Sequence, residues 1–313
     1  MTDKYCNFVV NYKNNIDNHK MNNVFKGLGI ALVTPFLENG EVDYDTLGML
    51  IEKQLAGKTD FFCVLGSTAE TPCLSSDEKL RIKDFSVERI AGRVPVLMGF
   101  GGNCTHTLTE EISSFDFSGV DGILSVCPFY NKPSQEGIFR HFKAVAEASK
   151  LPVVVYNVPG RTGINMTAAT TLRLARELPN IVAIKEASGN IAQIEEILNN
   201  KPAGFDVISG DDSITYELLS LGAAGVISVI GNALPDVFGE MVHCELAGNI
   251  SEALPIHHKL SNLFKLLSVD GNPAGIKAML SEMHLCRNLL RLPLVPARSE
   301  TQAAIRKEMG SLL

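Results

Sequence analysis

The most regular feature of this chain is an alternation, from residue 27 onward, between short apolar runs and longer stretches with helical periodicity. Most runs begin roughly 25 to 35 residues apart, which is the length of one βα unit. Continuously apolar runs are typical of strands that are buried on both faces, and eight in succession favour a closed (β/α)8 TIM barrel over an open doubly wound sheet. The expected strands are residues 29–33, 61–65, 94–98, 122–126, 153–156, 181–185, 206–209 and 225–229.

The segments between these runs carry helix signals. Asp43 is a suitable N-cap for a helix at 43–55, and residues 75–78 place acidic side chains at the start of another, where the helix dipole favours them. Further barrel helices are expected at 137–148, 167–178 and 190–198.

About 80 residues follow the eighth run, which is more than a barrel needs to close. Their pattern predicts helices at 235–247, 251–267, 273–284 and 299–309. We therefore expect a catalytic barrel at 24–233 and a C-terminal helical region at 234–313 packed on it. Residues 1–23, rich in Asn and Lys, are expected to form a disordered extension.

Composition excludes several classes of function. A net charge of -7 argues against a nucleic-acid surface and means that an anionic substrate needs a local cation. The seven cysteines form no C-x-x-C pair, which favours reduced thiols in a cytoplasmic protein over a disulfide framework or a closed zinc site. No metal site is expected, because the histidines lack a matching ligand spacing, and no run is long enough for a signal sequence or a membrane span.

Polar residues follow several of the predicted strands directly. In a TIM barrel, reactive groups project from the C-terminal ends of the strands, so these residues are functional candidates before any motif is considered. The polar strand ends are 66–70, 127–131, 156–161, 185–186 and 210–212.

Lys185 is the first candidate, since it ends an apolar run of four residues. Desolvation there disfavours the charged amine and favours a neutral nucleophile able to attack a ketone. The alternative is a structural lysine paired with the neighbouring carboxylate of Glu186, and position alone does not decide between the two.

Other strand ends favour the catalytic alternative. Tyr156 would lie one strand away, where a phenol can relay protons, and Thr68 and Tyr130 could complete a hydroxyl relay. The turn after Gly66 can receive a carboxylate on its backbone amides, although such turns also bind phosphate. Arg161 suits a second carboxylate, but by position alone it could equally be a solvated surface arginine.

Several of these motifs, in this order, resemble the pyruvate-dependent Schiff-base aldolases related to N-acetylneuraminate lyase and dihydrodipicolinate synthase. The resemblance covers essentially everything after Val24. Its main motifs are 128–137 (P-F-Y-N-K-P-S-Q-E-G), 156–163 (Y-N-V-P-G-R-T-G), 184–190 (I-K-E-A-S-G-N), 209–212 (S-G-D-D), 225–229 (G-V-I-S-V) and 272–273 (N-P).

The resemblance implies condensation of pyruvate with aspartate 4-semialdehyde, with no cofactor besides the lysine. Lys185 would form the imine with pyruvate, Tyr156 would be the general acid and base, and Thr68 and Tyr130 would complete the relay. Tyr130 would do so in a neighbouring subunit of a homotetramer, built as a dimer of dimers. Pyruvate would be held by Ser67, Thr68, Gly210 and the backbone at Ile227.

Arg161 would hold the carboxylate of the semialdehyde, and it favours the synthase over lyases that split sugar acids, which usually lack it. Such a lyase remains the alternative among enzymes, and a catalytically silent barrel is the alternative of another class. Turnover of aspartate semialdehyde, compared with sialic acid and 2-keto-3-deoxygluconate, would distinguish the synthase from the lyase. A pyruvate-dependent mass shift on Lys185 would exclude the catalytically silent barrel.

Two departures from the family pattern have consequences. Ala69 stands where a glycine is common, which is harmless only if its φ is negative. At the site where lysine inhibits many relatives, Asn103 matches, but Ser76, Lys79 and Thr107 replace the usual His, His and Glu, and Phe129 replaces Tyr. Without that Glu the lysine ammonium loses its anionic partner, so we expect weak or absent inhibition by lysine.

Overall fold

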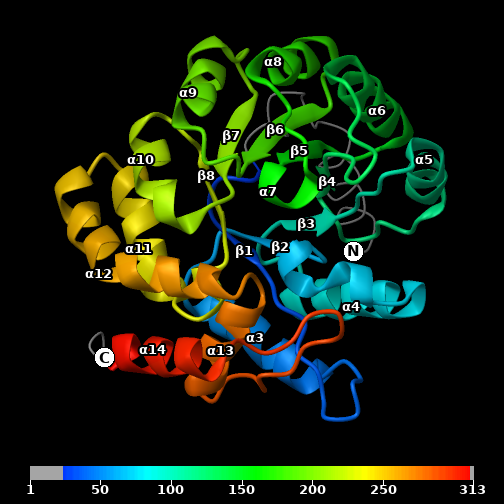
Figure 1. The fold of residues 1–313 in the computed structure, drawn as a ribbon. Coiled ribbons are helices and arrows are strands. Elements are labelled where there is room, and N and C mark those ends of the chain that lie inside the picture. The colour runs from blue at the N-terminus through cyan, green and yellow to red at the C-terminus, as the bar shows by residue number, and fades with distance from the viewer. Residues whose placement is uncertain (1–23, 311–313) are drawn as a thin grey trace, which may run out of the picture.

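The computed structural model describes residues 24–310, so the extension predicted for residues 1–23 lies outside the described residues. Within 24–310, eight parallel strands form a closed barrel in which β8 pairs with β1. This confirms the TIM barrel, and Figure 1 shows the strands around a central axis with helices outside them. The strands are β1 (Gly27–Ala31), β2 (Phe61–Val64), β3 (Val96–Gly99), β4 (Gly122–Val126), β5 (Val153–Asn157), β6 (Ile181–Glu186), β7 (Asp206–Ser209) and β8 (Gly225–Ser228).

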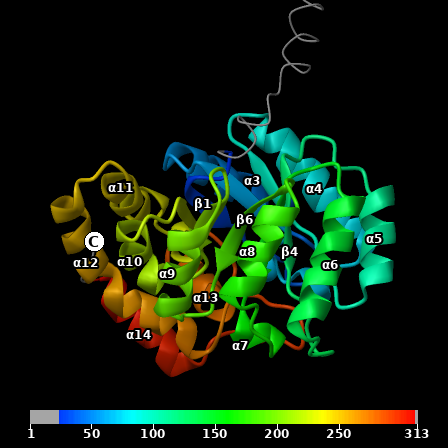
Figure 2. The same ribbon diagram turned by 90° about the horizontal axis from the view of Figure 1, so that it is seen from above.

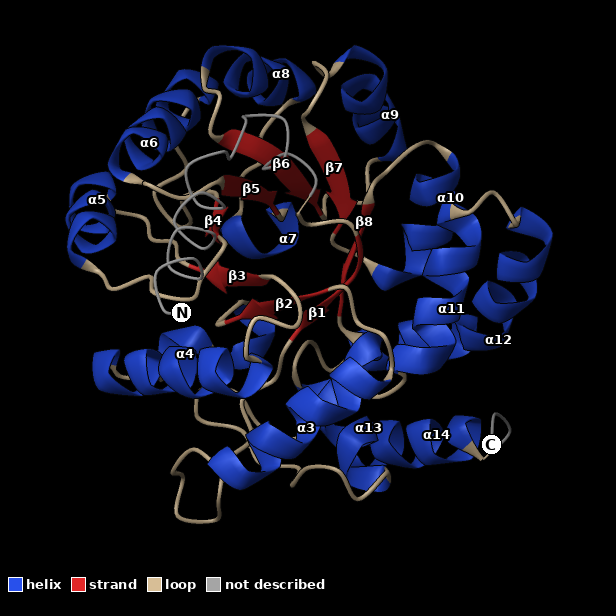
Figure 3. Cartoon of the chain, turned by 180° about the vertical axis from the view of Figure 1, so that it is seen from behind, coloured by secondary structure: helices blue, strands red, loops and turns tan. Residues whose placement is uncertain are grey.

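The helices between strands surround the barrel, as Figure 3 shows. As predicted, the side chain of Asp43 caps the helix after β1, and residues 75–78 begin the next helix. The structure adds a reciprocal capping box between Ser75 and Glu78. Helices α5 and α10 were not predicted, because α5 buries only two side chains and α10 has only six residues. The barrel helices are α3 (Tyr44–Ala56), α4 (Ser76–Ile90), α5 (Thr105–Ser114), α6 (Gln135–Ala148), α8 (Ala168–Glu177), α9 (Ile191–Asn200), α10 (Thr215–Ser220) and α11 (Pro235–Leu246).

Most strands differ from the prediction by one or two residues at an end, and two of these differences have identifiable reasons. β3 begins at Val96 rather than at residue 94, because Pro95 has no N–H to donate to a ladder. β8 ends at Ser228 because the next amide, that of Val229, donates to the side chain of Asp212 instead.

The C-terminal region holds α12 (Ile250–Val269), α13 (Ala274–Glu282) and α14 (Ser299–Met309). Helix α11 contacts β1 and β8, so it is the eighth helix of the barrel. The predicted boundary between the barrel and the C-terminal region, after residue 233, therefore separates β8 from the helix that follows it in the barrel. The later helices pack on α11 and on one another along one side of the barrel (Figure 1).

Alternation along the strands produces two cores. The larger core fills the space between strands and helices, and the smaller one fills the barrel interior with residues that include Cys63, Leu97, Val154, Ile208 and Ile227. Tyr156 belongs to the inner core, at the C-terminal end of β5, where TIM barrels carry their active sites. No helix among the described residues is long and apolar enough to cross a membrane.

Candidate active site

Lys185 lies at the C-terminal end of β6, paired in register with Tyr156 of β5 on one side and Ile208 of β7 on the other. Both partners face the barrel interior, so Lys185 does too. Lys185 is 6% exposed, and its Nζ lies 4.5 Å from the centroid of the Tyr156 ring. Within the described part of the chain, this amine forms no hydrogen bond and no ion pair.

Two small or apolar groups complete the wall around this amine. A side chain at Gly210 would come within 3.1 Å of Lys185 Cε, so the glycine leaves room for the lysine stem. Cys63 lies below, where burial raises the pKa of its thiol to about 11 although the charge of Lys185 opposes this rise. Both neighbours are small, so the lysine stem fits between them at the C-terminal end of the barrel.

Glu186 points to the opposite face of β6 and is fully buried. Asn157 Nδ2 donates to both of its carboxylate oxygens, at 3.0 and 3.3 Å. The Ser188 amide and Gln193 Nε2 donate at 3.0 and 3.3 Å. Burial raises the pKa of Glu186, and these hydrogen bonds oppose the rise. The structure therefore contradicts the alternative that Lys185 is a structural partner of Glu186.

The turn after β2 is the short helix η1 (Ser67–Ala69). Thr68 is 2% exposed, and its Oγ1 accepts a hydrogen bond from Asn272 Nδ2 at 2.8 Å. The left-handed φ of this turn, 56°, falls on Glu70 and not on Ala69, so the alanine methyl group is accommodated. Gly66 lies over the inner core, since a side chain there would come within 3.2 Å of Cys63 Sγ.

Arg161 lies on α7 (Pro159–Thr162), a single turn that Figure 1 shows across the middle of the barrel. Figure 2 shows this turn at one end of the barrel. Arg161 is exposed, and its Nη2 donates to the carbonyl oxygen of Asn272 at 2.9 Å. Asn272 thus contacts both Thr68 and Arg161. The N-P motif was recognised in the sequence, but nothing local in it predicted these two partners.

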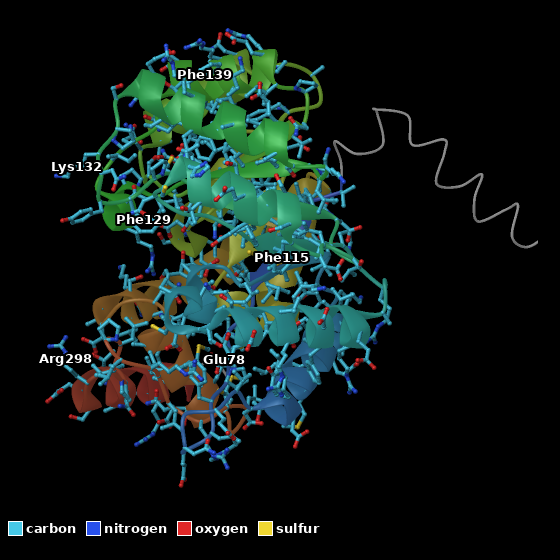
Figure 4. All side chains as sticks on the ribbon, turned by 90° about the vertical axis from the view of Figure 1, so that its right-hand side faces the viewer. Glu78, Phe115, Phe129, Lys132, Phe139 and Arg298 are labelled. Carbon is cyan, nitrogen blue, oxygen red and sulfur yellow. The ribbon has the colours of Figure 1, made fainter. Side chains whose placement is uncertain are left out.

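The structure does not bring Tyr130 to Lys185 within one chain. Tyr130 is 88% exposed with a φ of 73°, a conformation that is unusual for a bulky residue. Its neighbours Phe129 and Lys132 lie at the surface in Figure 4. Among residues 24–310 no hydrogen bond joins the hydroxyls of Thr68, Tyr130 and Tyr156, so the relay is not assembled in a single subunit.

Ile227 lies on β8, 1% exposed and facing the inner core, and Asp212 holds the backbone that follows it. Asp212 Oδ2 accepts from the amides of Val229 at 3.0 Å and Ile230 at 2.7 Å. Burial raises the pKa of Asp212 to about 6, although these hydrogen bonds lower it, and its Oδ1 is buried without a hydrogen-bond partner. Asp212 belongs to the S-G-D-D motif at 209–212, but the motif alone did not predict this role.

Within the described residues, no group of three or more His, Cys, Asp or Glu side chains is arranged to hold a metal ion. The groups gathered at the mouth are an unpaired amine, a phenol, a glycine-bounded turn and a guanidinium. This set suits covalent chemistry on a small carboxylated carbonyl compound.

Comparison with known proteins agrees with this arrangement. The model of the dihydrodipicolinate synthetase family matches residues 24–311. A 4-hydroxy-tetrahydrodipicolinate synthase of Phocaeicola vulgatus is 59% identical over 92% of this chain and 97% of its own. The dihydrodipicolinate synthase of Aquifex aeolicus superposes with a TM-score of 0.88 at 40% identity, covering 92% of this chain and 98% of its own.

A second solved relative is the enzyme from Cyanidioschyzon merolae with lysine bound. It has a TM-score of 0.88 and 39% identity over 93% of this chain and 99% of its own. The matches extend across both the barrel and the C-terminal helices, so they concern the whole described chain. The chain belongs to the dihydrodipicolinate synthetase family.

Proposed function

We propose that this chain condenses pyruvate with L-aspartate 4-semialdehyde through a Schiff base on Lys185. The product is 4-hydroxy-tetrahydrodipicolinate, on the route to diaminopimelate and lysine. The observation that carries the proposal is the buried, unpaired amine of Lys185 above the ring of Tyr156. A relative that bears the name of this synthase at 59% identity supports it.

The chemistry begins when the neutral amine of Lys185 attacks C2 of pyruvate to form a carbinolamine. Tyr156 donates a proton to the departing hydroxyl, water leaves, and an imine remains. Loss of a proton from C3 gives an enamine, which attacks the aldehyde carbon of the second substrate. The amino group of that substrate then attacks the imine carbon, closes the ring and releases Lys185.

Two sets of groups hold the substrates. The turn at Ser67 and Thr68, with Gly210 and the backbone at Ile227, holds pyruvate close to the amine. Arg161 holds the carboxylate of the aldehyde by charge-assisted hydrogen bonds. The exposed guanidinium has one backbone acceptor, which leaves donors free for a ligand. The aldehydes that sugar-acid lyases release carry no carboxylate that would require this cation, because the acid group of the substrate stays on pyruvate.

A homotetramer built as a dimer of dimers would complete the relay, because Tyr130 would reach the site of a neighbouring subunit. The exposure of this tyrosine in a single chain supports that role. We also propose a cytoplasmic location, which the free state of the described cysteines supports. No cofactor is proposed, since the imine nitrogen of Lys185 itself accepts the electrons of the C3 carbanion.

Weak or absent inhibition by lysine is proposed as well. Thr107, where many relatives carry Glu, is a neutral hydroxyl whose Oγ1 donates to Cys104 Sγ at 3.3 Å. An ammonium group bound there would lack an anionic partner. An inhibition constant for lysine in the sub-millimolar range would contradict this.

The test of the proposed function has two parts. Borohydride reduction in the presence of pyruvate should attach pyruvate covalently to Lys185, and peptide mass spectrometry would locate the modified residue. Turnover should then be measured with aspartate semialdehyde plus pyruvate, and separately with N-acetylneuraminate and 2-keto-3-deoxygluconate. Faster turnover of a sugar acid would favour the lyase, and absence of the adduct would exclude Schiff-base catalysis.

A further inference from the structure

A buried ion pair links the catalytic turn to the C-terminal region, and no step of the proposed chemistry uses it. Lys277 Nζ of α13 lies 2.5 Å from Glu70 Oε1, and both side chains are fully buried. The second oxygen, Glu70 Oε2, accepts the backbone amide of Arg291 at 2.9 Å. Lys277 also donates to the carbonyl of Leu289 at 2.8 Å. The ammonium and the carboxylate therefore each have a backbone hydrogen-bond partner in addition to each other.

Buried pairs of this kind are poor sources of stability. The cost of removing two charges from water often equals or exceeds their attraction, so an apolar replacement of similar volume is frequently neutral or stabilising. In some proteins, a fully paired buried charge instead fixes a local geometry. The position of Glu70 indicates which geometry is defined here.

Glu70 directly follows η1, the turn that carries Ser67 and Thr68, and has a left-handed φ of 56°. This conformation is disfavoured for a residue with a side chain and persists where surrounding contacts impose it. Both carboxylate oxygens of Glu70 are bound to the C-terminal region. The contacts that impose the end of the turn thus come from residues about 200 positions away in the sequence.

A second contact joins the same two regions. Asn272, five residues before Lys277, donates to Thr68 Oγ1 at 2.8 Å. A hydroxyl has one proton and two acceptor sites, so a donor on one acceptor site leaves the Thr68 proton to be directed elsewhere. Residues 272–277 therefore control both the place of the turn, through Glu70, and the orientation of its hydroxyl, through Asn272.

The barrel holds the same turn independently. Thr34 Oγ1 donates to the carbonyl of Ala69 at 2.8 Å, and Thr71 Oγ1 donates to that of Gly66, also at 2.8 Å. Loss of the ion pair should therefore shift the turn rather than unfold it. Such a shift matters for proton transfer, because a misplacement of about 1 Å can cost on the order of a hundredfold in rate.

We propose that Glu70 and Lys277 are positioning residues of the active site, whose buried ion pair holds the turn so that the Thr68 hydroxyl is aligned for proton transfer. This inference rests on the proposed function, in which Thr68 belongs to the relay. It gives the C-terminal region a direct part in catalysis, in addition to its packing on the barrel.

The test compares a paired replacement with its single variants. Glu70→Gln or Lys277→Met alone leaves an uncompensated buried charge and should lower the melting temperature. The combined variant, E70Q with K277M, leaves no such charge, so its melting temperature should return most of the way to that of the wild type. Its kcat should nevertheless remain lower by about tenfold to a hundredfold. A wild-type kcat in the combined variant would overturn the inference.

A second measurement separates positioning from a general structural effect. If the pair acts through Thr68, then adding E70Q and K277M to a Thr68→Val variant should change kcat by less than about twofold, since interacting residues are not additive. A full further loss there would also overturn the inference. Glu282→Gln with Arg306→Met, which removes the α13 to α14 ion pair at 2.6 Å, is the matched control and should keep wild-type kcat.

Borohydride trapping with pyruvate accompanies each assay. A wild-type chain that gives no adduct on Lys185 would overturn the proposed function, and with it this inference. A wild-type chain that gives the adduct, alongside a combined variant with unchanged kcat, would overturn this inference alone.

Discussion

Lys185 and Glu186 are consecutive residues of β6, yet they lie in opposite surroundings. Lys185 faces the barrel interior beside Tyr156, Cys63 and Gly210, and its amine forms no hydrogen bond and no ion pair within residues 24–310. Glu186 faces the helices, where both carboxylate oxygens accept hydrogen bonds.

The difference shows how one strand serves two purposes. Buried polar groups normally have hydrogen-bond partners, and the outer face of β6 follows this rule. The inner face departs from it at a single side chain, and the partner of that side chain is proposed to be the substrate. A polar group that the protein leaves unpaired at a strand end is therefore more informative than one that it satisfies.

The largest expected effect comes from the inner face. Lys185→Met should lower kcat by more than about 10⁴-fold, because no other group can form the imine. The melting temperature should stay the same or rise, since an unpaired amine is replaced by an apolar group of similar length. Activity assays and thermal melts would check both. Lys150→Met, on an exposed residue, is the control; substantial activity in the Lys185 variant would refute the nucleophile assignment.

Next in size is the loss of the phenol beside the amine. Tyr156→Phe should lower kcat by about 10² to 10⁴-fold, the usual contribution of a general acid and base, with little change in stability. Tyr216→Phe is a matched control, because Tyr216 stacks on His257 away from the inner core. If steady-state kinetics gave equal rates for Tyr156→Phe and the wild type, the relay would have to begin elsewhere.

On the outer face the expected effect is on stability. Glu186→Ala leaves the Ser188 amide without this acceptor, and it removes one of several acceptors of Asn157 and Gln193, which also donate to Asn165 Oδ1 and the Met166 carbonyl. An unsatisfied buried donor costs about 1 to 3 kcal/mol, so we expect the free energy of unfolding in urea to fall by about 3 kcal/mol. The pyruvate adduct on Lys185 should still form. The exposed Glu195→Gln is the control, and a variant as stable as wild type would contradict this account of the outer face.

The smallest effect concerns Asp212, a carboxylate that is only half satisfied. Its pKa of about 6 in the folded chain exceeds the unfolded value of about 3.9, so the folded chain binds more protons between these values. The free energy of unfolding should therefore fall as the pH rises from about 4 to about 6, by on the order of 2 kcal/mol, and stay lower above that.

Asp212→Asn should abolish this particular decrease, so the stability of the variant relative to wild type should improve across the same pH range. Urea unfolding at several pH values would measure it, with the exposed Asp77→Asn as the control. Parallel pH profiles for Asp212→Asn and wild type would show that Asp212 titrates normally.

The sequence predicted the barrel and the place of Lys185 because both depend on local patterns. A strand period and an apolar run are readable over a few residues, and the end of a parallel strand defines one edge of the barrel. The partners of the polar groups were not predictable in the same way. Asn272 meets Thr68 across 204 positions, and no local period marks such a contact.

One feature of the sequence does indicate a long-range contact of this kind. Lys277 stands alone in the apolar stretch A-G-I-K-A-M-L of a predicted helix, and a charged residue there requires a buried partner. The sequence could not name Glu70 as that partner. For Tyr130 the situation is reversed. Its motif was recognised in the sequence, but in a single chain the side chain is 88% exposed, so its role in the relay stays a prediction.

The contacts of residues 272–291 with the mouth of the barrel also bear on the order in which the protein is made. A nascent chain that has reached residue 271 contains all eight strands, together with Lys185 and Tyr156. It still lacks the groups that hold Thr68, Glu70 and Arg161. The reactive end of the barrel is therefore completed last, when the C-terminal region leaves the ribosome.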